Sequence, residues 1–88
     1  LHANFPNPFN PTTSIKYDLP ENAAVSLMIY DIMGREIRHL VNETQNAGFK
    51  AIMWDGTNSN GNQVGTGMYL YHIKAGSFVQ TRKMILMK

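Results

Sequence analysis

The stretch Val25–Leu40, VSLMIYDIMGREIRHL, decides the fold class, because it holds two strand patterns and the turn between them. Val25–Tyr30 alternates with period two, and both of its faces are apolar enough for a central strand. Asp31-Ile32-Met33-Gly34 fits a type I turn closed by a glycine at positive φ. Arg35–Leu40 then returns as a more polar strand. The stretch therefore predicts an antiparallel β-hairpin.

Four further strand patterns flank this hairpin at intervals typical of a sandwich or barrel. They are Ser14–Leu19, Gly48–Trp54, Met68–Ala75 and Phe78–Met87. Ala75-Gly76-Ser77 predicts a second tight hairpin between the last two. The one helical alternative is Arg35–Asn46, where Ile37, Leu40 and Val41 have a helical spacing but no N-cap precedes them. The sequence predicts an all-β protein, an antiparallel sandwich of six to seven strands.

Size and composition limit the functions that the chain can have. Its 88 residues suffice for one domain, with a Pro/Asn-rich lead-in over 1–13 and the sandwich over 14–88. The net charge of +2 comes from scattered basic residues, which argues against a nucleic-acid partner. The chain has no cysteine, so a disulfide, a thiolate zinc site and a cysteine nucleophile are excluded. Catalytic motifs are missing, and we expect neither an enzyme nor a small-molecule substrate.

The lead-in contains the segment Asn4–Thr13, NFPNPFNPTT. Its prolines favour an extended path, with Phe5 and Phe9 anchored on the sandwich and the prolines protecting a sheet edge. Pro8–Pro11 also fits the PxxP pattern of polyproline ligands, but no basic residue flanks it. We therefore expect a structural role for this segment.

The loop after Trp54, DGTNSNGNQVGTG, has a weak resemblance to a calcium-binding loop. Asp55, Thr57 and Ser59 offer oxygen ligands at alternate positions, but Asp55 is the only acidic residue in the loop. Turns formed by Asn and Gly explain the composition without a metal. We expect no cofactor, with calcium as the weaker alternative.

Trp54, Tyr69 and Tyr71 have two possible uses. If exposed, they would form a sugar-stacking surface, and the chain would be a carbohydrate-binding accessory domain. Large aromatic side chains of a small sandwich more often fill its core. We therefore expect all three to be buried.

Several phrases occur together and in order along the chain: NPFNP, IYDIMGRE, WDG, G-x-Y-x-Y and a closing RKMILMK. With this set the chain resembles the type A C-terminal sorting domain of the type IX secretion system, found on exported proteins of Bacteroidetes. It is also similar to the immunoglobulin-like domain of the flagellar hook-capping protein, a structural assembly module. Both resemblances imply an immunoglobulin-like sandwich. The NPFNP opening favours the sorting domain.

The sorting resemblance implies a role and a set of partners. Such a domain directs an N-terminal passenger through an outer-membrane translocon, and a surface peptidase commonly removes it afterwards. The protein would then be secreted or held at the cell surface, by way of the periplasm. By this resemblance, translocon recognition would involve Gly76 in the last turn and five residues near the end: Lys83, Met84, Ile85, Leu86 and Lys88. The alternative is that the last strand only completes the core.

Overall fold

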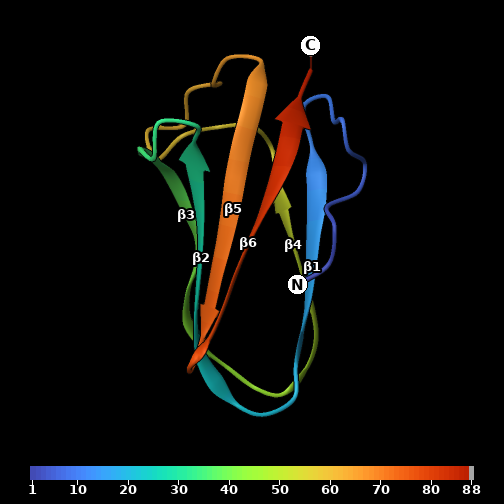
Figure 1. Ribbon diagram of the computed structural model, residues 1–88, viewed down its shortest axis with the longest axis vertical. Helices are drawn as coiled ribbons and strands as arrows, with labels where there is room; N and C mark the ends of the chain where they lie inside the picture. Colours follow the sequence, from blue (N-terminus) through green and yellow to red (C-terminus); the bar gives the residue numbers. More distant parts are fainter. Residues whose placement is uncertain (88) are drawn as a thin grey trace.

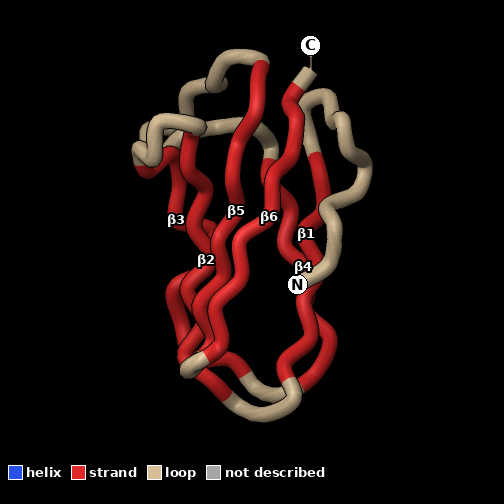
Figure 2. The backbone as a smooth tube through the Cα atoms, viewed as in Figure 1, coloured by secondary structure: helices blue, strands red, loops and turns tan. Residues whose placement is uncertain are grey.

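The computed structural model describes residues 1–87, so Lys88, one of the expected recognition residues, lies outside the described part. This part contains six β-strands, which pair into two sheets that face each other (Figures 1 and 2). The strands are β1 (Thr13–Leu19), β2 (Ala23–Asp31), β3 (Glu36–Gln45), β4 (Gly48–Trp54), β5 (Gly67–Ala75) and β6 (Phe78–Leu86). No helix long and apolar enough to cross a membrane is found in residues 1–87.

The larger sheet has the order β3-β2-β5-β6, and the smaller sheet pairs β1 with β4. All these pairings are antiparallel. Strand β2 lies between β3 and β5 and is therefore the central strand that its sequence predicts. One of its faces is buried in the core, and the other is half-buried. The predicted antiparallel sandwich is confirmed.

The turn between β2 and β3 has the predicted geometry. The Gly34 N–H donates to the Asp31 carbonyl at 3.0 Å, and Gly34 has a φ of +83°. The Asp31 carboxylate accepts from the Arg35 and Met33 N–H groups, both at 2.9 Å. These bonds, first the one from the Arg35 backbone, hold the pKa of Asp31 below its usual value. A hydrogen-bonded aspartate therefore fixes the register of the hairpin.

Strand β3 is longer than predicted and excludes the helical alternative, because it runs to Gln45. Its register against β2 shifts twice, so that Leu40 and Ile37 each have no direct partner. A bulge of this kind inserts an extra residue and interrupts the period-two pattern. Ile37 and Leu40 both pack against the core. The two bulges thus explain why the apolar spacing of this strand resembles that of a helix.

The core lies between the two sheets and is formed by alternate residues of their facing strands. Its members include Ile15, Tyr17 and Leu19 of β1, Val25, Leu27 and Ile29 of β2, Tyr69, Tyr71 and Ile73 of β5, and Met84 and Leu86 of β6. Val41 of β3, Trp54 at the end of β4 and Phe9 of the lead-in complete it. The lead-in is therefore part of the folded unit.

Candidate recognition surface

Strands β5 and β6 form the last hairpin, as the sequence predicts. Ala75 is opposite Phe78, which leaves Gly76-Ser77 as a two-residue loop. Gly76 has a φ of +60°, in the left-handed region that two-residue hairpin loops require. An added Cβ at Gly76 would meet nothing within 4 Å, so its backbone conformation alone explains the glycine.

Along β6 the side chains divide into an inner and an outer row. Met84 and Leu86 belong to the inner row and are buried in the core. Lys83 and Ile85 belong to the outer row and are exposed. Of the residues expected to contact a translocon, Met84 and Leu86 therefore have no exposed side chain in the folded domain. The reason is the period of two: neighbours in a strand point to opposite faces.

The backbone of β6 offers a second feature, because β6 is an edge strand. The N–H and C=O groups of Ile85 point away from β5, since both bond to the lead-in. In an antiparallel pair, residues whose backbone groups bond to the neighbouring strand alternate with residues whose backbone groups point away from it. The N–H and C=O groups of Lys83, Thr81 and Val79 therefore also point away from β5. Within residues 1–87 they make no backbone hydrogen bond on that side. The sign of an edge in the sequence of β6 is its pair of adjacent cations, Arg82 and Lys83, because charged side chains are common on edge strands.

The lead-in covers the C-terminal end of this edge. The Phe9 N–H donates to the Ile85 carbonyl at 3.0 Å, and the Met87 N–H donates to the Phe9 carbonyl at 2.8 Å. The Asn7 side-chain oxygen accepts from the Ile85 N–H at 3.0 Å. The lead-in also lies beside the segment 79–83, because the Arg82 Nε–H donates to the Leu1 carbonyl at 3.0 Å, and Ala3 and Asn7 line a pocket together with Thr81 and Lys83. Within residues 1–87 it makes no backbone hydrogen bond there, so the unpaired part of the edge is the segment 79–83.

Of the two phenylalanines expected to anchor the lead-in, only Phe9 does so. Phe9 is buried, with its ring centroid 5.7 Å from that of Trp54. Phe5 is 78% exposed, because it pairs through its backbone with Ser14 at the edge of β1. The lead-in bends at residues 6–8 and 10–11, so the predicted extended path is wrong. The peptide bonds before Pro6, Pro8 and Pro11 are cis. With Phe9 in the core, a PxxP ligand role has no support.

A buried tyrosine joins the lead-in to β5. The Tyr71 hydroxyl accepts from the Asn4 N–H at 2.9 Å and donates to the His2 carbonyl at 3.1 Å. Burial raises the pKa of Tyr71. The buried Asn4 amide also donates to the Thr13 hydroxyl at 3.0 Å. Sequence reasoning missed Asn4, although its place within the Asn- and Pro-rich segment is a possible sign.

The three aromatic residues proposed for sugar stacking are buried, so that surface does not form. The Trp54 ring meets the Tyr69 ring edge-on at 5.4 Å, and its N–H donates to the Thr57 carbonyl at 2.9 Å. The predicted burial of Trp54, Tyr69 and Tyr71 is confirmed.

In the loop after Trp54, Asp55 lies beside an arginine of β3. The Arg38 guanidinium of β3 donates to the Thr57 hydroxyl and lies 3.6 Å from the Asp55 carboxylate. The Thr57 hydroxyl in turn donates to Asp55, and this bond contributes most to the lowered pKa of Asp55. The Ser59 hydroxyl donates to the Ile37 carbonyl instead. Residues 1–87 contain no group of three or more His, Cys, Asp or Glu side chains placed to hold a metal.

The model of the FlgD Ig-like domain family matches residues 8–77. The solved structure of FlgD from P. aeruginosa matches with 27% identity and a TM-score of 0.66, over 84% of this chain and 57% of that one. Dimeric latent PorU from Porphyromonas gingivalis matches with 25% identity and a TM-score of 0.75, over 96% of this chain and 9% of that one.

PorZ, a surface component of the type IX secretion system of Porphyromonas gingivalis, matches at 18% identity with a TM-score of 0.68. This match covers 98% of this chain and 11% of PorZ, and at that identity it shows the fold alone. No curated protein sequence matches the chain. The chain thus spans 57% or less of the length of each of these three solved structures. The family match covers most of the sandwich, and the chain belongs to the FlgD Ig-like domain family.

Proposed function

We propose that this domain is a non-catalytic sorting module that directs an N-terminal passenger across the outer membrane by way of the periplasm. Its partners are then an outer-membrane translocon and a surface peptidase, and it needs no cofactor. The observation that carries the proposal is the open edge of β6, with free backbone groups at Val79, Thr81 and Lys83. An exposed sheet edge can bind an extended segment of a partner by adding a strand.

Two further features support this role for β6. The similarity to PorU extends over 96% of this chain. The exposed row beside the open edge combines Val79, Lys83 and Ile85, and this apolar and basic mixture offers side-chain specificity in addition to backbone pairing.

The proposal changes which residues act in recognition. Lys83 and Ile85 remain candidates for direct contact, and Val79 and Thr81 join them. Met84 and Leu86 act by holding β6 on the core. Gly76 acts by closing the hairpin that places β6.

A proline at Thr81 tests the edge directly. Because the Thr81 N–H faces away from β5, Thr81→Pro removes no ladder bond within the sheet but prevents a further strand from pairing there. Residues 1–88 would be fused to an inert passenger in a host with type IX machinery. We expect export of the parent fusion, and a fall of about tenfold or more for T81P, because strand addition needs that edge.

The matched control is Ala51→Pro on β4, which places a proline at an outward-facing N–H of the other sheet. Thermal unfolding of both variants checks that the domain still folds. Export of T81P at the parent level, with the fold intact, would refute the proposed use of the edge.

A structural module of hook-cap type is the second candidate, and the family match with the 27% identity to FlgD favours it. This candidate predicts that the parent fusion stays in the periplasm. Export of the passenger by residues 1–88 therefore separates the two functions.

A further inference from the structure

The small sheet also has an open edge, on β4. On β1, the Ser14 N–H and C=O groups and the Lys16 C=O group bond to the lead-in. The alternate residues of β1 therefore bond to β4, and their partners there are Gly48, Lys50, Ile52 and Trp54. It follows that the N–H and C=O groups of Phe49, Ala51 and Met53 face away from β1. Within residues 1–87 nothing pairs with them.

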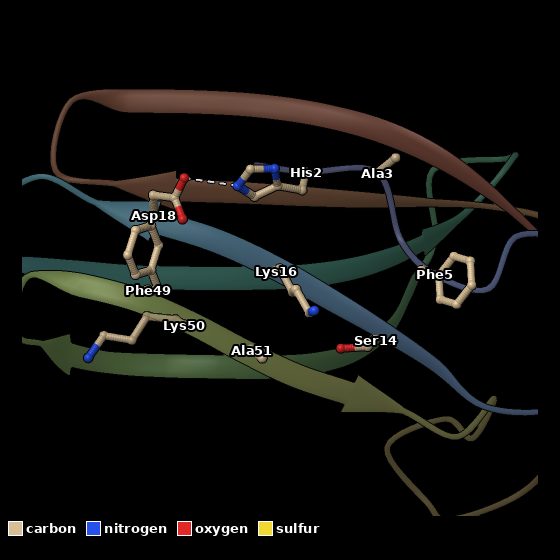
Figure 3. Close-up of a pocket in the computed structure, with 9 residues that line it drawn as sticks. All are labelled: His2, Ala3, Phe5, Ser14, Lys16, Asp18, Phe49, Lys50 and Ala51. Carbon is tan, nitrogen blue, oxygen red and sulfur yellow. Dashed lines mark hydrogen bonds and ion pairs between the residues drawn. The ribbon is translucent and has the colours of Figure 1, made fainter.

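The side chains of the same three residues lie on the outer face of the small sheet. Phe49 is 89% exposed, Met53 is 64% exposed, and Ala51 between them is also exposed. Figure 3 shows Phe49 and Ala51 on this face, beside Lys16 and Asp18 of β1. The Asp18 carboxylate lies 2.9 Å from the His2 ring, so it is already paired with the lead-in.

The edges of β3 and β6 are each covered over part of their length and carry charges that oppose pairing between two copies of the same edge, whereas the edge of β4 has neither protection. On β3, the loop residue Ser59 bonds to Ile37 at the edge, and the strand carries Glu36 and Glu43. On β6, the lead-in covers Ile85, and the strand carries the cations Arg82 and Lys83. Charges and covering segments of this kind prevent edge-to-edge association. Strand β4 has one charged residue, Lys50, and no covering segment among residues 1–87.

We propose that β4 is a self-association edge, at which two copies of this chain join their small sheets into one four-stranded sheet. The edge can pair with the same edge of a second copy, because two large apolar residues, Phe49 and Met53, lie two positions to either side of Ala51. Antiparallel pairing around a two-fold axis at Ala51 places each Ala51 opposite the other and each Phe49 opposite a Met53. The three facing pairs exchange about six backbone hydrogen bonds.

This register is favourable for the side chains as well. Phe49 meets Met53 of the second copy on the outer face, a pair of large apolar side chains of the kind that stabilises sheets. Lys50 falls opposite Ile52, so no like charges face each other. The contact is isologous and closes with two copies, which gives a dimer. A single strand pair buries little surface, so the association is weak and depends on concentration.

The test measures the mass of the 88-residue chain by sedimentation equilibrium at concentrations up to about 1 mM, where weak interfaces of this class associate. We expect a monomer–dimer equilibrium whose dissociation constant rises about tenfold or more in A51P, because proline removes a donor at the two-fold axis and obstructs pairing. T81P, a proline at the open edge of β6, is the matched control and leaves the dimer unchanged.

Two double variants test the register. F49E/M53E places like charges opposite each other at both ends of the interface and weakens the dimer. F49K/M53E places opposite charges there and restores it. Both sites are exposed, so the fold tolerates the changes. A chain that stays monomeric at every concentration, or a dimer that A51P does not weaken, would overturn the proposal. Equal dimerisation of the two double variants would overturn the register.

Discussion

Leu86→Ala separates the two roles of β6, which are to complete the core and to bind a partner. Leu86 is 1% exposed and packs in the core cluster, so its truncation leaves a cavity between the sheets. Leucine-to-alanine changes in cores cost about 2–5 kcal/mol, and we expect about 3 kcal/mol. A chain of 88 residues has a stability of about 4–13 kcal/mol, so L86A removes a large part of it.

At about 4–8 °C per kcal/mol, the melting temperature of L86A falls by roughly 12–24 °C. Urea unfolding followed by the fluorescence of the single, buried Trp54 measures the free energy directly. Ile85→Ala is the matched control: Ile85 is 41% exposed, and its truncation costs less than about 1 kcal/mol. Equal stability of L86A and the parent would refute the assignment of Leu86 to the core. Loss of export by L86A at a temperature where it is fully folded would show that Leu86 is contacted directly.

Two further changes test the contacts that hold the lead-in and the first hairpin. Tyr71→Phe leaves the buried Asn4 N–H without its acceptor and costs about 1–3 kcal/mol in urea unfolding; unchanged stability would contradict this role. Because the folded domain lowers the pKa of Asp31 below 3.8, its stabilising effect is present at neutral pH and is lost as the pH falls through the folded-state value. The free energy of unfolding of D31N therefore falls less at acid pH than that of the parent. E21Q, which changes an exposed carboxylate, is the control and follows the parent. Parallel pH profiles of D31N and the parent would be evidence against this role of Asp31.

The strands and tight turns could be predicted because they depend on local sequence. Alternation set the faces of β1, β2 and β5, and the glycine at position 34 set the first hairpin turn. Strand β3 was predicted too short because its two bulges interrupt the alternation that defines a strand. A bulge depends on pairing with a neighbouring strand, which the local sequence does not contain.

The candidate site could be predicted only in part, for the same reason. The resemblance selected β6, but whether a residue of β6 contacts a partner depends on which face points inward. Which face of β6 points inward depends in turn on the position of the second sheet. The resemblance therefore implies a recognition role for Met84 and Leu86, whereas the structure buries both side chains in the core. The contact between Asn7 of the lead-in and Ile85 joins residues 78 positions apart, which no local pattern predicts.

The treatment of its sheet edges connects the fold with both proposals. A sandwich with open sheets has unpaired backbone at its margins, and each margin must be covered, charged or used. The lead-in closes the edge of β1 and one end of β6, and the loop at Ser59 covers part of β3. Among the segments left unpaired, 79–83 ends in two cations and is suited to a partner strand, and the mainly apolar segment 49–53 complements itself. The same backbone chemistry thus offers two contacts, and the side chains beside each edge decide which strand it accepts.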